Sequence, residues 1–390
     1  MIDITNPSSP PFLGNVDTYI TDVTVSGSYA YVAALDLNVI DISDPSAPMV
    51  VGTVGFPINQ PAGVAVSGSY AYVTDPYGYD PESTQSGRLR IIDISNPASP
   101  TQVGSVHSTG GKVWSSSPLS GIAVSGDYVY VACPDENDPL TGPGSLQVID
   151  VSNPTRPSTV ATVPVPEFPC YSIATSGPYA YVTGFKETIT TYPVFSVTRT
   201  TGVRVIDISS PWAPVVVGGL TLTSPPNSST WYQVVAAGNY LYVAGSPALQ
   251  VIDVSDPTAP AIVATYLGNS RGVAVQGSNA YLIRGTEIRV VDIQNPLSPI
   301  TKGVGYLSGG TRAVTANSSY LFVGGDLKGD PDVTSLFIYP LQCPEFTPVR
   351  LSSFVALPQS NGIVLKWATS NETEFSGFHV RRSTQGKRRL

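Results

Sequence analysis

The stretch VAVSGSYAYVTDP at residues 64–76, followed by LRIIDISNPASPTQVGSV at residues 89–106, decides the fold. In the first half, two runs with alternating apolar residues flank a Ser-Gly turn, which predicts a β-hairpin. In the second half, an apolar run leads into a turn bounded by two prolines and then into another run. Because proline cannot donate to a sheet ladder, the prolines predict a turn followed by an edge strand. The stretch therefore predicts a unit of four strands.

Near-copies of this unit recur along most of the chain, which indicates an array of one supersecondary unit. The first half occurs seven times, at residues 23–33, 64–74, 122–132, 173–183, 234–244, 273–283 and 314–324. The second half occurs at residues 37–54, 89–106, 146–163, 203–220, 249–266 and 288–305. No apolar stretch combines helical spacing with helix caps, so we expect an all-β fold.

Seven units of four strands predict a seven-bladed β-propeller of four-stranded blades. A β-solenoid is the main alternative, but its coils tolerate little variation in length, whereas these units run from about 39 to 58 residues.

The two ends of the repeat region predict how the ring closes. Residues 1–16 match the second half of a unit, and residues 335–340 form a degenerate third strand with no fourth strand after it. We therefore expect residues 10–16 to supply the outer strand of the last blade, which leaves no open sheet edge. Residues 1–4 duplicate a third strand, so eight blades are the alternative. The chain starts within a repeat and without a signal peptide, so we expect it to be a fragment or a processed piece.

The third-strand motifs carry a family resemblance. VIDIS at 39–43, RIIDIS at 90–95 and QVIDVS at 147–152 resemble the LVIVD repeat of bacterial and archaeal surface proteins. The resemblance covers roughly residues 1–341 and depends on the repetition of the motif. It implies a propeller on an extracellular or cell-surface protein, in a family with no settled activity, and it carries over no catalytic residue.

The last part of the chain, residues 342–390, has a different pattern, so we expect two domains, 1–341 and 342–390. This segment resembles the opening half of a fibronectin type III-like domain. Its apolar residues alternate as sandwich core residues do, at Leu351, Phe354, Ile363, Leu365 and Trp367. Because a sandwich needs roughly 100 residues, we expect this short β-type tail to be poorly packed, mobile or docked on the propeller.

Charge and hydropathy exclude two classes of partner. The net charge is −8, and only 12% of the residues are charged. Binding to nucleic acid requires clustered Lys and Arg that neutralise phosphates, so we expect no nucleic-acid partner. No apolar run reaches the roughly 18 residues that a membrane span needs, so we expect no membrane insertion.

The length of the repeats varies at only two of the four connections. The connections between strands one and two and between strands three and four are short and uniform. The inserts between strands two and three are Pro76–Gly87, Pro134–Gly144, Phe185–Thr201 and Asp326–Val333. The inserts between blades are Gly55–Pro61, His107–Leu119, Pro164–Cys170 and Thr221–Trp231. In a propeller both classes lie on one face, and loops held on a rigid scaffold are where binding usually resides.

Aromatic residues in these inserts are the candidate ligand contacts, because aromatic side chains suit sugar faces and protein anchors. The candidates are Tyr77, Tyr79, Trp114, Phe185, Tyr192 and Trp231. The competing interpretation is that they pack their own long loops onto the ring.

The sequence offers little catalytic or metal chemistry. Aspartates recur before the proline turns in every unit, where a carboxylate can accept backbone N–H bonds, so we expect a structural role. Asp326, Asp330 and Asp332 offer oxygens for Ca²⁺, but their spacing is not that of an EF-hand, and a solvated acidic loop is the alternative. The two histidines are His107 and His379, and one histidine without a fixed partner is weak support for a hydrolase.

Two cysteines lie at the ends of neighbouring units. Cys133 follows a second strand and Cys170 precedes the next first strand. Both are expected on the face with the inserts, so a disulfide is one possibility and two separate buried thiols are the other.

These observations predict a non-enzymatic extracellular or cell-surface propeller. Its partner is expected to be a protein or carbohydrate that binds the face with the inserts. The alternative is a structural module that self-associates in a surface layer or filament, and a hydrolase or lyase that uses the same face is the third hypothesis.

Overall fold

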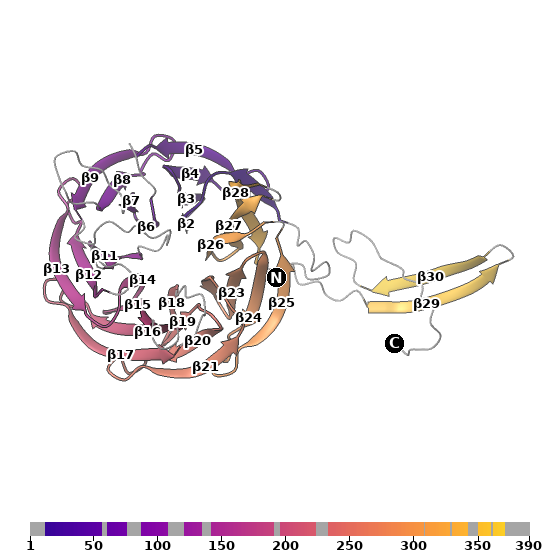
Figure 1. Cartoon of the computed structure of the whole chain (residues 1–390). Helices are drawn as coiled ribbons and strands as arrows, with labels where there is room; N and C mark the ends of the chain where they lie inside the picture. Colours follow the sequence, from indigo (N-terminus) through magenta and orange to yellow (C-terminus); the bar gives the residue numbers. More distant parts are fainter. Residues whose placement is uncertain are drawn as a thin grey trace. The chain divides into compact units, whose positions relative to one another are not determined.

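The computed structural model describes residues 12–56, 61–75, 87–107, 121–134, 142–190, 196–223, 233–307, 309–327, 330–341, 350–359 and 362–370. The chain divides into two compact units, Met1–Leu341 and Gln342–Leu390. The first unit consists of seven four-stranded antiparallel sheets arranged in a ring (Figure 1). The predicted seven-bladed all-β propeller is therefore confirmed, and the ring has seven blades, not eight.

Each blade has one strand near the centre of the ring and one at its rim (Figure 1). The innermost strands are β2 (Asp22–Ser26), β6 (Gly63–Ser67), β10 (Ile122–Ser125), β14 (Cys170–Ser176), β18 (Val234–Ala237), β22 (Gly272–Gln276) and β26 (Thr311–Ala316). The outermost strands are β5 (Met49–Val54), β9 (Thr101–His107), β13 (Ser158–Val165), β17 (Val215–Thr223), β21 (Ala261–Leu267), β25 (Ile300–Tyr306) and β1 (Gly14–Asp17).

Two further strands fill each blade. The second strands are β3 (Tyr29–Ala33), β7 (Tyr70–Asp75), β11 (Tyr128–Cys133), β15 (Tyr179–Thr190), β19 (Tyr240–Val243), β23 (Asn279–Arg284) and β27 (Tyr320–Leu327). The third strands are β4 (Leu37–Asp41), β8 (Arg88–Asp93), β12 (Gly144–Asp150), β16 (Ser196–Asp207), β20 (Ala248–Asp253), β24 (Glu287–Asp292) and β28 (Asp330–Pro340). We number the blades 1 to 7 in the order of their innermost strands.

Blade 7 joins the two ends of the repeat region. Its outer strand, β1, pairs antiparallel with β28, with Gly14 opposite Ile338 and Asp17 opposite Ser335. Leu13 N–H also donates to the Ile338 carbonyl at 2.8 Å. The outer strand of this blade thus comes from the first part of the repeat region and its other three strands from the last part.

The core lies between blades, because strands two and three present apolar residues to both neighbours. One cluster joins blades 1 and 2 and includes Val39, Val73 and Ile92, all fully buried. Similar clusters lie at other interfaces around the ring. Strands that are buried on both faces have near-continuous apolar sequences, which explains why Val-Ile and Ile-Ile pairs recur before the aspartate of third strands.

The glycine of the outer strand allows close packing between neighbouring blades. A Cβ atom on Gly52 would lie 2.2 Å from the Pro97 carbonyl oxygen in the proline turn of blade 2. The same contact recurs at Gly14, Gly104 and Gly218. The prolines therefore do more than shape their own turn, since each such turn fills the space above the glycine of the preceding blade.

Gly52→Ala is expected to destabilise the propeller by about 1–3 kcal/mol, because its Cβ forces the proline turn of blade 2 to move. Gly55→Ala is the matched control, since its Cβ would meet only the Asp36 Oδ1 atom, at 3.5 Å. Urea denaturation measures both variants. Equal midpoints for Gly52→Ala and Gly55→Ala would contradict the proposed packing.

The second unit contains an antiparallel hairpin of β29 (Arg350–Gln359) and β30 (Gly362–Ser370). Its register places Phe354 opposite Trp367 and Ala356 opposite Leu365. The alternation noted in the sequence thus belongs to a two-stranded sheet.

Candidate functional site

The order of the strands places the irregular connections on one face of the ring, which we call the loop face. It carries the connections between strands two and three and those between blades. The opposite face, the turn face, carries connections of two or three residues between strands one and two. It also carries the connections between strands three and four, which have seven residues in each of blades 1 to 6. On the loop face the connections between strands two and three differ in length, from residues 285–286 in blade 6 to residues 76–87 in blade 2.

Most of the predicted ligand contacts lie outside the described residues, namely Tyr77, Tyr79, Trp114, Tyr192 and Trp231. Phe185 is described, and it does not fit the prediction of a surface contact. Its side chain is buried and stacks on Tyr171, with ring centroids 4.9 Å apart, in the cluster between blades 4 and 5. Phe185 therefore contributes to the core, as the competing interpretation of the loop aromatics held.

The insert of blade 4 is a β-hairpin and not an open loop. Strands β15 and β16 stay paired from Tyr179–Asp207 outward to Thr190–Ser196. The predicted insert Phe185–Thr201 is therefore mostly a continuation of the blade's own ladder. The hairpin pairs Thr, Val and Ile residues of high β-propensity, a signal that the sequence does contain.

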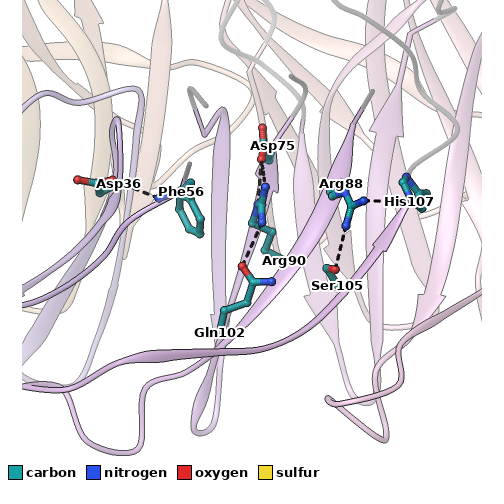
Figure 2. A network of polar contacts seen from close by, with 8 residues as sticks. All are labelled: Asp36, Phe56, Asp75, Arg88, Arg90, Gln102, Ser105 and His107. Carbon is teal, nitrogen blue, oxygen red and sulfur yellow. Dashed lines mark hydrogen bonds and ion pairs between the residues drawn. The ribbon is translucent and has the colours of Figure 1, made fainter. Parts of the chain in front are cut away.

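A buried ion pair lies at the root of the blade 2 insert, where β7 ends (Figure 2). Arg90 Nη2 and Nε donate to Asp75 Oδ2 at 2.7 and 2.9 Å. The Asp75 side chain is fully buried and that of Arg90 is 9% exposed. Arg90 also donates to Gln102 Oε1 at 3.1 Å, and its guanidinium lies 5.2 Å from the centroid of the Phe56 ring. The pair therefore ties three strands of blade 2 to the connection from blade 1.

A second arginine of the same strand contacts His107 (Figure 2). Arg88 Nη2 lies 3.3 Å from His107 Nε2, and Arg88 Nη1 donates to Ser105 Oγ at 3.4 Å. His107 was expected in the insert, but it is the last residue of β9 and lies opposite Arg88 in the ladder. Because a guanidinium is only a donor, Nε2 of His107 acts as the acceptor. This nitrogen is thus oriented toward Arg88 rather than toward a nucleophile.

Arginines over aromatic rings recur where the chain passes from one blade to the next. Arg204 lies 5.2 Å from the Phe168 ring centroid and Arg312 lies 5.4 Å from that of Tyr19. The aromatic residue comes from a connection between blades and the arginine from an adjacent strand. Cation–π contacts of this kind fix the connections on the loop face.

The innermost strands are joined by polar side chains near the loop face. Asp22 accepts from the backbone N–H of Val64 in blade 2 at 2.9 Å and from that of Val23 at 2.8 Å. Ser172 and Gln233 make the corresponding bond to the next blade. Burial raises the pKa of Asp22 to about 6, and the two hydrogen bonds oppose that rise.

The two predicted disulfide partners form no disulfide with each other, and both are separate buried thiols. Cys133 ends β11 and Cys170 begins β14, so they do belong to neighbouring blades. They lie close enough for Cys133 to contribute, after burial, to raising the pKa of Cys170 well above its ordinary value. A thiol of high pKa is a poor nucleophile, so the structure holds Cys170 as a packing residue.

The repeated aspartates have the structural role expected of them. Those of blades 1 to 6 each accept the backbone N–H of the residue two positions later, namely Asp41, Asp93, Asp150, Asp207, Asp253 and Asp292. Asp326, a predicted Ca²⁺ ligand, accepts from Arg312 Nε at 2.6 Å, while the side chains of Asp330 and Asp332 lie outside the described part. Within the described residues, no group of three His, Cys, Asp or Glu side chains could hold a metal ion.

The sequence interpretation missed an aromatic residue on the turn face. Trp212 is 63% exposed in the proline turn of blade 4, where the other blades carry Ser46, Ala98, Thr155, Thr258 and Leu297. Alignment of the repeats contains this signal, because a small or polar residue is usual at that position. Val215 is exposed at the start of the outer strand of the same blade, and Ile300 is exposed at the start of the outer strand of blade 6.

The described residues contain no helix that is long and apolar enough to cross a membrane.

Solved structures with the same architecture are numerous. One is a functionally unknown protein from Desulfotomaculum acetoxidans DSM 771, with 13% identity, a TM-score of 0.56, and coverage of 81% of this chain and 93% of that one. Another is the β-propeller domain of Myceliophteria thermophila Cps50 (Swd1), with 10% identity, a TM-score of 0.58, and coverage of 84% and 98%. At these identities the likeness shows the fold alone. A search of curated proteins found no match.

The family comparison matches the LVIVD repeat at residues 1–18, 19–55, 61–108, 119–164, 232–268 and 267–304. The two blades whose innermost strands have no match, blades 4 and 7, are those in which that strand has a register shift near its start, at Cys170/Ser172 and at Thr311/Ala313. They nevertheless complete the ring with four strands each. Because the matches cover more than half of the chain, this protein belongs to the LVIVD repeat family.

Proposed function

We propose that this chain is a non-enzymatic propeller, extracellular or at the cell surface, that binds a protein or glycan through its loop face. The observation that carries the proposal is that connections of variable length occur on one face of the ring only. The connections of the turn face are uniform, whereas those of the loop face range from two residues at 285–286 to fourteen at 108–121. Stable ring packing requires no such inserts, and binding residues are commonly placed on loops of a rigid scaffold.

The polar groups on the described part of the loop face support binding more than catalysis. The buried acid Asp75 is neutralised by Arg90, and His107 Nε2 contacts Arg88. On the turn face, the repeated aspartates are likewise engaged, because they accept backbone N–H bonds within the proline turns. A hydrolase or lyase would need an acid and a base oriented toward one reacting centre, and these groups are instead oriented toward structural partners.

Trp114→Ala and Trp231→Ala are expected to abolish glycan recognition or weaken it at least tenfold. Both residues belong to the long inserts that the sequence predicts between blades, and the stacking of a sugar ring on an indole is worth roughly 1 kcal/mol or more. A glycan array identifies ligands, and titration in solution then measures affinity without avidity. Trp212→Ala is the control, since it removes an exposed indole from the turn face.

Unchanged affinity in the Trp114→Ala and Trp231→Ala variants would contradict recognition of sugars by these residues. Loss of affinity in Trp212→Ala alone would place the binding surface on the turn face and would overturn the proposal.

The exposed apolar residues near the turn face support a second candidate function, assembly with other copies of the chain. Trp212, Val215, Leu297 and Ile300 have exposed fractions of 58–63%. Blades 2 and 3 carry a threonine and a serine where blades 4 and 6 carry Val215 and Ile300. Sedimentation velocity would show association that is weakened by Trp212→Ser with Leu297→Ser, and a concentration-independent monomer would exclude this candidate.

A further inference from the structure

The loop face is built from short connections over blades 5 and 6. The connection between β19 and β20 covers residues 244–247, and the one between β23 and β24 covers residues 285–286. The connections that enter blades 6 and 7 cover residues 268–271 and 307–310. This sector therefore differs from blades 2 and 3, where longer segments lie between the second and third strands.

Two arginines occupy the same repeat position in this sector. Arg271 and Arg312 each stand two residues before the valine that opens the first-strand motif, Val273 or Val314. Arg271 directly precedes β22, Arg312 lies in β26, and these two innermost strands are neighbours in the ring. Arg312 Nε donates to Asp326 Oδ1 at 2.6 Å, and Arg271 lies within electrostatic reach of both Arg312 and Asp326. Burial and the charge of Arg312 lower the pKa of Arg271.

A third arginine adds to the positive charge. Arg284 ends β23, is exposed, and donates to the side-chain oxygen of Asn269 through both terminal nitrogens, at 2.8 and 2.6 Å. Glu287, at the same end of blade 6, forms an ion pair with Arg289. Guanidiniums therefore outnumber carboxylates among the side chains described in this sector, although the whole chain has a net charge of −8.

Two buried hydroxyls lie beside the arginines in the chain. Ser270 precedes Arg271 and is 5% exposed, and Thr311 precedes Arg312 and is 3% exposed. Neither hydroxyl oxygen has a hydrogen-bond partner within the part of the chain that the structure describes. A buried hydroxyl without a partner costs free energy, and an anion oxygen would supply the missing acceptor. These hydroxyls are an observation independent of the charges.

We propose that Arg271 and Arg312 together bind an oxyanion, the carboxylate, sulfate or phosphate group of a ligand, on the loop face between blades 6 and 7. Guanidinium groups bind such planar or tetrahedral anions through charge-assisted hydrogen bonds. The inference rests on the proposed function, since it names the ligand chemistry that one sector of the loop face recognises.

The test is isothermal titration of the full chain with sodium sulfate and with sodium acetate at constant ionic strength set by chloride. Saturable binding is expected, and the two salts distinguish a sulfate- or phosphate-like group from a carboxylate. Arg271→Gln is expected to weaken binding at least tenfold. Asp326→Asn is expected to tighten it several-fold, because it removes the competing negative charge. Arg156→Gln, which removes an exposed arginine from the turn face, is the matched control and keeps the wild-type affinity.

Arg271→Lys retains the positive charge and separates binding from folding, since it is expected to retain part of the affinity. The absence of saturable binding to the wild type would overturn the inference, as would equal affinities for the wild type and Arg271→Gln. If anions fail to bind while Trp114→Ala still abolishes glycan recognition, the anion site is refuted and the proposed function stands. If anions bind but neither tryptophan variant changes recognition, the anion site stands and recognition of sugars by Trp114 and Trp231 is refuted.

Discussion

Asp75→Ala is expected to lower the free energy of unfolding of the propeller by about 3–5 kcal/mol, because it leaves the guanidinium of Arg90 buried without its carboxylate. The Asp75 side chain is fully buried and accepts two hydrogen bonds from Arg90 (Figure 2). When one member of a buried ion pair is removed, nothing offsets the desolvation penalty of the charge that remains. The remaining contacts of Arg90, with Gln102 and the Phe56 ring, are neutral and do not compensate for the lost charge.

Chemical denaturation of three variants tests the origin of this loss. Asp75→Leu combined with Arg90→Met removes both charges and retains apolar volume, so it is expected to recover most of the stability that Asp75→Ala loses. Asp36→Ala is the control, because its carboxylate accepts a longer bond, 3.3 Å, from Phe56 N–H. If the double variant is as unstable as Asp75→Ala, the loss comes from packing and not from the unpaired charge.

The stability of the wild type relative to Asp22→Asn is expected to fall by about 3 kcal/mol as the pH rises from about 3.5 to about 7. The pKa of Asp22 is about 6 in the folded protein, against an ordinary value of 3.8, and burial is the main cause of the rise. A carboxyl whose folded pKa is raised stabilises the fold fully below the unfolded pKa. That contribution is lost as the pH rises through the folded pKa, because the folded state must then hold a desolvated charge.

Urea denaturation of both proteins at several pH values gives this difference. The amide introduced by Asp22→Asn loses one acceptor toward Val23 or Val64, but that loss does not depend on pH, so the slope isolates the titration. Asp44→Asn is the control of opposite sign, since hydrogen bonds from Ser46 lower the pKa of Asp44 below its ordinary value of 3.8. The wild type therefore loses stability relative to that variant as the pH falls through this acidic range. A flat difference for Asp22→Asn over the whole pH range would show that this carboxyl does not titrate as stated.

The local features of the blades could be predicted from the sequence. The Ser-Gly turns are two-residue hairpin connections, with Gly27 and Gly68 at positive φ, 58° and 57°. The aspartates before the proline turns accept backbone N–H bonds within two residues. Each of these features depends on residues close in the chain, so the same turn and the same hydrogen bond can be predicted from each copy of the repeat.

The placement of side chains between blades could not be predicted in the same way. Phe185 was expected on a loop surface, and it is buried because Tyr171 of the adjacent strand offers a ring to stack on. His107 was expected in an insert, and it instead continues the ladder opposite Arg88. Both outcomes depend on how far a blade's ladder extends, which the sequence pattern of a single repeat does not define.

By itself the sequence determined a ring of repeated four-stranded sheets and the face on which extra chain length gathers, because strand alternation and turn chemistry act over a few residues. Only the tertiary structure decided which glycine packs under which proline turn, that Asp75 and Arg90 form a buried pair, and that Arg271 and Arg312 come together across two blades. These contacts join residues from different strands or blades, and their energies depend on distance and desolvation, which exist only once the ring has closed.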